Sequence, residues 1–140
     1  MLVSRRTTII VLVLVAVLAI VAAFYTPKLL NWNKQEGYGN VSVQEASNLI
    51  ADTPDLVILD VRTIAEFNDG HIEGATNIPV DELSTRLSEL SKNDELLVYC
   101  RTGNRSTIAV NILEDAEYTK IYHMYEGISE WMQQGYPLVQ

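Results

Sequence analysis

Apolar runs and amphipathic stretches alternate along the chain from about residue 40 to its end. Three apolar runs have the length of buried strands, and they lie at residues 56–61, 95–99 and 120–124. Three stretches place hydrophobic side chains at helical spacing, and they lie at residues 83–90, 108–113 and 128–132. A further short helix is expected at residues 42–51. Strands that alternate with helices predict an α/β fold in which helices flank a mostly parallel sheet.

Local signals mark the ends of several of these elements. Ser42 and Glu45 form a capping-box pattern, which predicts the start of the first helix. Pro79 precedes the second helix, and Gly135 with Pro137 ends the last one. These signals agree with the hydrophobic pattern, so we predict one domain built from alternating strands and helices.

A longer hydrophobic segment fills the N-terminal region. Every residue from Ile9 to Phe24 is apolar, and the segment extends over residues 7–25. About 19 residues at a rise of 1.5 Å per residue span a ~30 Å hydrocarbon layer. We therefore divide the chain into a transmembrane anchor, a linker and a domain, which occupy residues 1–25, 26–39 and 40–140.

Charges beside this segment slightly favour a cytoplasmic N-terminus. Arg5, Arg6 and the terminal amine precede the segment, whereas Lys28 and Lys34 follow it. The tail before the segment is also very short. We therefore expect a single-pass protein of the cell membrane, with the domain on the extracytoplasmic side.

Two alternatives explain the same apolar segment. Val21–Ala23 has the small residues of a signal-peptide cleavage site, but the apolar run is longer than a usual signal peptide contains, and this favours a retained anchor. A buried core helix is disfavoured because a uniformly apolar helix has no polar face for water. Trp32 fits either the membrane interface or a contact with the domain, and the sequence leaves both open.

The charge of the domain excludes one class of partner. The whole chain has a formal net charge of −8, and from Gly39 onward 17 acidic residues oppose six basic ones. Such an acidic domain is unsuited to the phosphate backbone, so we expect no nucleic-acid partner. Against this background Arg101 and Arg105 form a local positive site within one short loop.

That loop also follows the single cysteine of the chain, Cys100. One cysteine cannot form an intramolecular disulfide, and a free thiol in an oxidising compartment requires either burial or a chemical role. A small buried side chain is the ordinary role of a cysteine at a strand end. The cationic, glycine-containing loop that follows argues against that role here.

The expected position of Cys100 favours a thiolate. We place Cys100 at the end of a strand and the following loop at the start of a helix near Ser106, and parallel sheets bind ligands at the carboxyl ends of their strands. A helix N-terminus and a tight loop at Gly103 both present N–H groups. These groups and the arginines lower the pKa of a thiol. The pattern predicts a nucleophilic Cys100 that receives an anionic substrate.

Three ordered groups of residues resemble the rhodanese domain, of the single-domain thiosulfate sulfurtransferase type. The most specific is the cysteine loop, with the sequence Cys-Arg-Thr-Gly-Asn-Arg-Ser at residues 100–106. The second group comprises Leu59–Arg62, Glu66–Phe67, Gly70–Ala75 and Asn77–Pro79. The third group comprises Gly127–Ile128, Trp131 and Gly135–Pro137. The resemblance covers residues 40–140 and implies a three-layer α/β sandwich.

The resemblance also implies a sulfurtransferase. The Cys100 thiolate would attack the outer sulfur of a donor such as thiosulfate, become a persulfide, and pass the sulfur to cyanide or a thiol in a ping-pong reaction. The loop residues that would surround the persulfide are Arg101, Thr102, Gly103, Asn104, Arg105 and Ser106. The resemblance implies no metal and no organic cofactor, and it identifies no protein partner.

Individual roles follow from the same resemblance. Arg105 would order the loop or meet the anion, and Arg101 would face solvent and receive the donor. For each arginine a salt bridge to its surroundings is an equal alternative. Asp60 and Arg62 match a family pair that would support the site from beside it, as an arginine–carboxylate pair can.

Four other residues have expected roles outside the chemistry itself. Glu66 and His71 are expected to be structural rather than catalytic. Glu126 occupies a position where the family often has glycine, and it lies beside the path to the site, so it could alter substrate access. Glu117 occupies a position where many members have a glycine, and we expect this replacement of glycine to weaken a helix cap.

The sequence leaves three rival functions open. Phosphatases of the same fold have five residues between cysteine and arginine, whereas Arg101 to Asn104 make four, and Tyr99 precedes the cysteine instead of histidine. A tethered non-enzymatic module could carry sulfur, sense oxidants through Cys100 or dock a partner. Metal binding has little support, because His71 and His123 are distant in sequence and His123 is expected to be packed in the domain.

Overall fold

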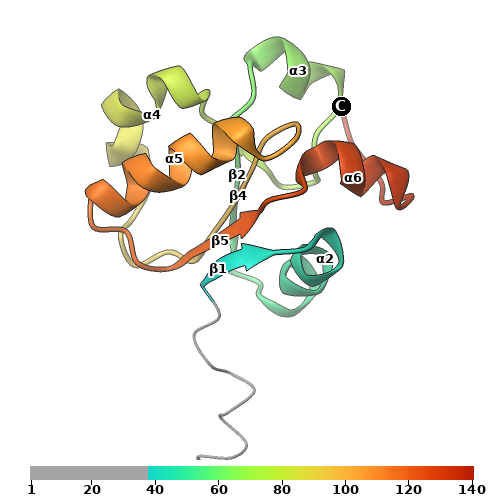
Figure 1. The fold of residues 1–140 in the computed structure, drawn as a ribbon, viewed down its shortest axis with the longest axis horizontal. Helices are drawn as coiled ribbons and strands as arrows, with labels where there is room; N and C mark the ends of the chain where they lie inside the picture. Colours follow the sequence, from blue (N-terminus) through green and yellow to red (C-terminus); the bar gives the residue numbers. More distant parts are fainter. Residues whose placement is uncertain (1–37) are drawn as a thin grey trace, which may run out of the picture. The chain divides into compact units, whose positions relative to one another are not determined.

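A computed structural model describes residues 38–140 of the chain (Figure 1). The predicted anchor and all but the last two residues of the predicted linker lie outside these described residues. Within residues 38–140, no helix is both long enough and apolar enough to cross a membrane.

The described part of the chain folds around a five-stranded sheet. All its strands are parallel, in the order β1-β5-β4-β2-β3. Their bounds are β1 Gly39–Val41, β2 Val57–Asp60, β3 Thr76–Asn77, β4 Leu96–Tyr99 and β5 Ile121–Met124. The three strands predicted from apolar runs are the three central strands. The two edge strands were not predicted, since two or three residues are too few to show a strand period.

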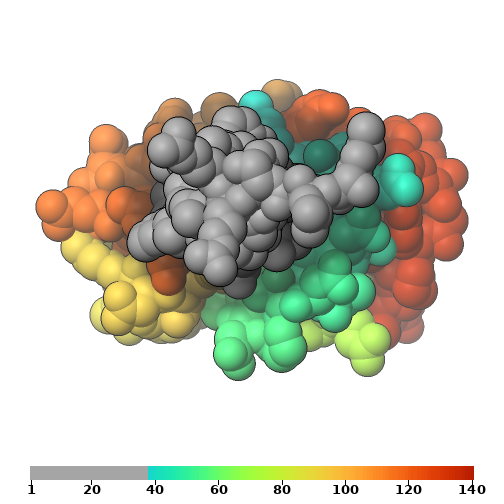
Figure 2. Space-filling model, turned by 90° about the horizontal axis from the view of Figure 1, so that it is seen from below, coloured from blue at the N-terminus to red at the C-terminus, as the bar shows by residue number. Residues whose placement is uncertain are grey.

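Helices cover both faces of the sheet (Figure 1). Their bounds are α2 Val43–Asp52, α3 Ile64–Asp69, α4 Val80–Arg86, a 3₁₀ turn η2 at Leu87–Glu89, α5 Asn104–Asp115 and α6 Gly127–Gln133. Side chains of α4 and α5 bury one face of the sheet, and those of α2 and α6 bury the other. The view in Figure 2 accordingly has α5 (orange) and the α6 region (red) on opposite sides. The predicted three-layer α/β arrangement is confirmed.

Two capping boxes begin helices of this domain. Ser42 accepts a hydrogen bond from the backbone N–H of Glu45, whose carboxylate accepts one from the N–H of Ser42 at 2.8 Å, as predicted. The same reciprocal pair between Thr63 and Glu66 begins α3, which was not predicted. Each box supplies acceptors to N–H groups that the first turn of a helix leaves without partners.

Glu117, at the end of α5, has an unusual backbone conformation. The N–H of Tyr118 donates to the carbonyl oxygen of Leu113 at 3.0 Å, and the N–H of Glu117 donates to that of Glu114 at 2.9 Å. This pair of bonds is a Schellman motif, which normally has glycine in the left-handed position. Glu117 holds that position with φ of 66°, so the expected weakening of a helix cap has a conformational cause.

Candidate active site

Cys100 follows the last residue of the central strand β4, and its thiol is buried, with 1% of the residue exposed. The chain then turns tightly and enters α5 at Asn104, two residues before the start that the sequence indicated. Gly103 is the N-cap of α5 and has φ of 93°. The loop is therefore closed within three residues, and its N–H groups curl around the cysteine sulfur.

Hydrogen-bond donors converge on this sulfur. The backbone N–H of Gly103 lies 3.2 Å from Cys100 Sγ, and the hydroxyl of Ser106 lies 3.3 Å from it. Burial raises the pKa of the Cys100 thiol, but the bonds from Ser106 and from the N–H groups of Thr102 and Gly103 outweigh it, and the net pKa is lowered. These contacts favour the thiolate form of Cys100 relative to an ordinary thiol, which is the direction that the sequence indicates.

Helix α6 holds the outer side of the loop. The N–H of Ile128 donates to the carbonyl oxygen of Cys100 at 2.9 Å, and the N–H of Ser129 donates to that of Arg101 at 3.1 Å. Gly127 has φ of 73°, and a Cβ there would overlap the backbone of Arg101. With these carbonyls turned toward α6, the loop presents its N–H groups to the sulfur.

The hydroxyl of Ser106 connects the sulfur to a histidine that sequence reasoning did not assign to the site. Ser106 Oγ lies 2.8 Å from His123 Nε2 and 2.9 Å from the carbonyl oxygen of Gly103. His123 lies on β5 and is 7% exposed, so the prediction that it is packed in the domain is correct. Its Nδ1 lies 2.9 Å from Asn40 Oδ1 on β1.

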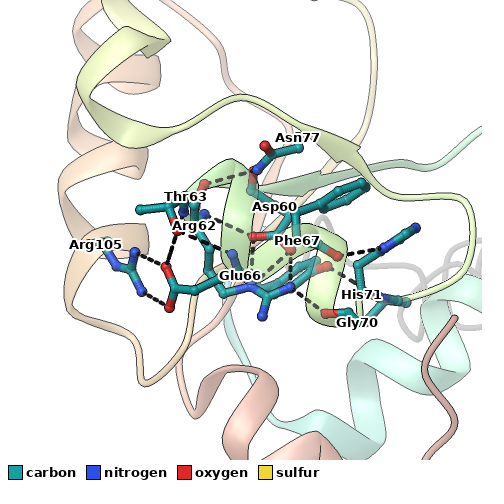
Figure 3. A network of polar contacts seen from close by, with 11 residues as sticks. Asp60, Arg62, Thr63, Glu66, Phe67, Gly70, His71, Asn77 and Arg105 are labelled. Atoms are coloured by element: carbon teal, nitrogen blue, oxygen red, sulfur yellow. Dashed lines mark hydrogen bonds and ion pairs between the residues drawn. The ribbon is translucent and has the colours of Figure 1, made fainter. Parts of the chain in front are cut away.

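Arg105 forms a bidentate ion pair with Glu66 (Figure 3), with Nη1–Oε2 and Nη2–Oε1 distances of 2.6 and 2.8 Å. This pair lowers the pKa of Glu66 to about 2, because the carboxylate accepts both bonds from the guanidinium, and it raises the pKa of Arg105. Of the roles considered for Arg105, the structure shows the salt bridge to its surroundings, and this pair ties α5 to α3. Arg105 still attracts the Cys100 thiolate electrostatically.

The remaining loop residues face solvent. Arg101, Thr102 and Asn104 are all exposed. Within residues 38–140, Arg101 makes no ion pair. Its guanidinium therefore remains available to an anion that approaches the loop.

Asp60 and Arg62 form a buried pair beside the site, and Figure 3 shows its connections. Arg62 Nη2 lies 2.6 Å from Asp60 Oδ2 and donates to the carbonyl oxygen of Gly70 at 2.8 Å. The guanidinium also lies 5.8 Å from the centre of the Tyr99 ring. The pair therefore ties the end of β2 to the end of α3 and to the strand that precedes Cys100.

Glu126 does not point at the thiol loop. Its Oε2 accepts a hydrogen bond of 2.8 Å from the N–H of Val43, the first residue of α2. A carboxylate is stabilised at a helix N-terminus. The departure from the family glycine is thus accommodated by a contact with α2.

The histidines and acids of the described residues do not gather into a metal site. His71 Nδ1 lies 3.0 Å from the carbonyl oxygen of Phe67, and its ring stacks on the Phe67 ring. Among residues 38–140, no group of three His, Cys, Asp or Glu side chains could hold a metal ion.

Comparisons with known proteins agree with this geometry. A family model for the rhodanese-like domain matches residues 42–134. A sulfurtransferase of Allochromatium vinosum is 33% identical over 99 residues, which are 71% of this chain and 92% of that protein. A thiosulfate sulfurtransferase of Tolumonas auensis is 30% identical over 94 residues, which are 67% of this chain and 88% of that one.

A solved structure has the same fold. The crystal structure of a rhodanese-related protein from Thermoplasma volcanium aligns with a TM-score of 0.64 and 31% identity, and the match covers 73% of this chain and 98% of that one. Together with the family model, which spans most of the chain, this match establishes the family. The chain belongs to the rhodanese-like domain family.

Proposed function

We propose that this protein is a sulfurtransferase that moves a sulfane sulfur from a donor such as thiosulfate to cyanide or a thiol. The observation that carries the proposal is the buried Cys100 sulfur with N–H and O–H donors converging on it. Such a site lowers the pKa of the thiol and can hold a second anionic sulfur. Family membership and relatives named as sulfurtransferases support the same reaction class.

The first half-reaction loads the enzyme. The Cys100 thiolate attacks the outer sulfur of thiosulfate, a new S–S bond forms, and the bond to the sulfite sulfur breaks. Sulfite leaves with that electron pair, and Cys100 becomes a persulfide anion. The donors from Gly103 and Ser106 that face Sγ lie on the side of the loop where the persulfide charge would develop.

The second half-reaction removes the transferred sulfur from the enzyme. Cyanide or a thiolate attacks the terminal sulfur, the persulfide S–S bond breaks, and the thiolate of Cys100 is restored. The two halves share one covalent intermediate, so the kinetics should be ping-pong. Arg101 is the exposed cation of the loop and would receive the anionic donor, whereas Arg105 is already paired with Glu66.

Steady-state rates with thiosulfate and cyanide test this proposal. We expect parallel double-reciprocal plots and complete loss of transfer in Cys100→Ser. Arg101→Gln should raise KM for thiosulfate, while its effect on the cyanide half-reaction stays small. Sulfur transfer that persists in Cys100→Ser would refute the mechanism, and a thiol that alkylates readily but takes up no sulfur would favour a redox-sensing or docking module.

We also propose that residues 7–25 anchor the protein in the cell membrane, with the domain on the extracytoplasmic side. The apolar length of the segment and the arginines before it support this topology. Cys100 provides the test, because it is the only thiol of the chain. A small membrane-impermeant alkylating reagent should label Cys100 in intact cells, and labelling that requires cell lysis would contradict the orientation.

A further inference from the structure

An unbroken hydrogen-bonded chain leads from the thiol of Cys100 to the edge of the sheet. Ser106 Oγ lies 3.3 Å from Cys100 Sγ and 2.8 Å from His123 Nε2. The other ring nitrogen, His123 Nδ1, lies 2.9 Å from Asn40 Oδ1. The four residues come from the cysteine loop, α5, β5 and β1, and the sulfur-transfer steps above do not use the last two.

The hydrogen-bond partners of the imidazole ring determine which of its nitrogens carries the proton. Asn40 Oδ1 can only accept, so His123 Nδ1 carries a hydrogen and donates it. The neutral ring then has a lone pair at Nε2, and the Ser106 hydroxyl donates to it. That hydroxyl has one proton and two further acceptors near it, the Gly103 carbonyl oxygen at 2.9 Å and Cys100 Sγ at 3.3 Å. The protonation state of the ring therefore decides where the hydroxyl points.

We propose that His123 accepts, through Ser106, the proton that Cys100 gives up when it becomes a nucleophile, and that Asn40 holds the imidazole in the tautomer that can do so. The S–H bond of Cys100 breaks and its proton binds Ser106 Oγ. The O–H bond of Ser106 breaks and its proton binds His123 Nε2. The products are a thiolate, an intact hydroxyl that now donates to Sγ, and an imidazolium. The step needs no oxidant or reductant.

Burial and charge around the thiol–imidazole couple, formed by Cys100 and His123, are consistent with this transfer. Burial lowers the pKa of His123 and keeps the ring neutral and free to accept, whereas the Gly103 carbonyl opposes this shift because it can accept only from the protonated ring. A thiolate one hydroxyl away offsets the burial of the imidazolium, as paired charges do. Among residues 38–140, the polar groups that act on the ring are the Asn40 amide, the Ser106 hydroxyl and that carbonyl.

Within residues 38–140, neither strand neighbour of His123 brings a carboxylate to the ring. Its neighbour in register on β4 is the apolar Val98, and on β1 it is Asn40 itself. Arg105 on α5 attracts the Cys100 thiolate and is paired with Glu66, whose pKa is about 2, so the charge of this ion pair stays constant above about pH 4. A coupled titration of thiol and imidazole above that pH therefore reports on the couple itself.

The inference rests on the proposed sulfur transfer for its purpose, but thiol ionisation can be measured without any sulfur donor. The rate of alkylation of the full chain by iodoacetamide, followed against pH, reports on Cys100 alone, because the chain has one cysteine. Ser106→Ala and His123→Gln should each move the inflection upward by one pH unit or more, which lowers the rate about tenfold below the inflection. His71→Gln is the matched control and should not move it.

A second measurement covers the case in which a substitution at His123 perturbs folding. The chain has two histidines, so isotope-labelled histidine gives two NMR titrations, and that of His71 is an internal reference. In Cys100→Ser the pKa of His123 should fall, because the thiolate that favours the imidazolium is gone and coupling between two sites is reciprocal. Asn40→Asp should raise that pKa, because its carboxylate accepts from Nδ1 and adds a negative charge.

The outcomes separate the two proposals. Identical titrations of His123 with and without the Cys100 thiol, or an alkylation inflection that is unchanged in His123→Gln, would overturn the proton relay even if sulfur transfer is observed. Coupled titrations in a protein that never takes sulfur would uphold the relay and refute only the proposed reaction.

Discussion

A Cβ atom at Gly103 would overlap the carbonyl oxygen of Tyr125, so the cysteine loop and the turn between β5 and α6 are in direct backbone contact. The contact explains how residues on two adjacent strands build one site. It also means that the loop cannot change shape without moving the start of α6, whose N–H groups hold the carbonyls of the loop.

Gly103→Ala should therefore abolish sulfur transfer and destabilise the domain. The substitution adds a steric overlap with backbone to the penalty of about 1–2 kcal/mol for a side chain in the left-handed region. Urea unfolding and the thiosulfate assay measure the two effects. Gly135→Ala is the control, because Gly135 has φ of 80° but nothing within 4 Å of its added Cβ. Equal losses in the two variants would contradict the role of the Tyr125 contact.

Glu117→Gly should stabilise the domain by about 1 kcal/mol. Glu117 is a non-glycine residue in the left-handed position of the Schellman motif, and glycine removes that strain. The lost ion pair with Lys92 is well exposed and contributes little. Equilibrium unfolding in urea measures the gain. Glu114→Gly, inside α5, should instead destabilise the domain, and a loss of stability in Glu117→Gly would contradict the strain argument.

The pair between Glu66 and Arg105 predicts a specific loss of stability in acid. The pKa of Glu66 is about 2 in the folded protein and 4.5 in its ordinary state. Between these values the unfolded chain binds more protons, so the stabilisation is fully present above about pH 4.5 and disappears as the pH falls toward 2.

The melting temperatures of wild type and Glu66→Gln, compared as a function of pH, measure this contribution. The wild type should be more stable at pH 6, and the difference should shrink steadily below pH 4.5. Glu73→Gln, at an exposed position, should track the wild type throughout. A difference that stays constant down to pH 2 would show that the ion pair is not its source.

The buried pair of Asp60 and Arg62 predicts that a single variant loses more stability than a double variant. Arg62→Met leaves Asp60 buried without its cation and should destabilise by about 3–5 kcal/mol. The double variant Asp60→Asn with Arg62→Met removes both charges and should recover part of that loss. Urea unfolding of both proteins tests this, with Arg86→Met in an exposed pair as the control. No recovery in the double variant would place the loss in packing rather than in charge.

Much of the fold could be predicted because its central elements carry strong local patterns. The buried strands β2, β4 and β5 are apolar runs, and α2 begins with a capping box. Helix α3 escaped detection because none of its six residues is fully buried, so no apolar stripe exists. The Thr63 and Glu66 capping pattern was the one signal that could have revealed it.

For the candidate site, too, one part could be predicted from the sequence and another part could not. The cysteine, its loop and its position at a helix start could be predicted, because they are contiguous in the sequence and depend on local backbone geometry. Glu66 lies 39 residues from its partner Arg105 in the sequence, and His123 lies 17 residues from Ser106. Asn40 lies 83 residues from His123. Only the order of strands in the sheet brings these side chains together, and that order leaves no local pattern.

The most direct test of the central claim is the intact mass of the full chain after incubation with thiosulfate without reductant, and again after cyanide. We predict a gain of one sulfur atom that cyanide removes and that Cys100→Ser never acquires. No gain in mass by a protein whose Cys100 still alkylates readily would contradict the persulfide mechanism.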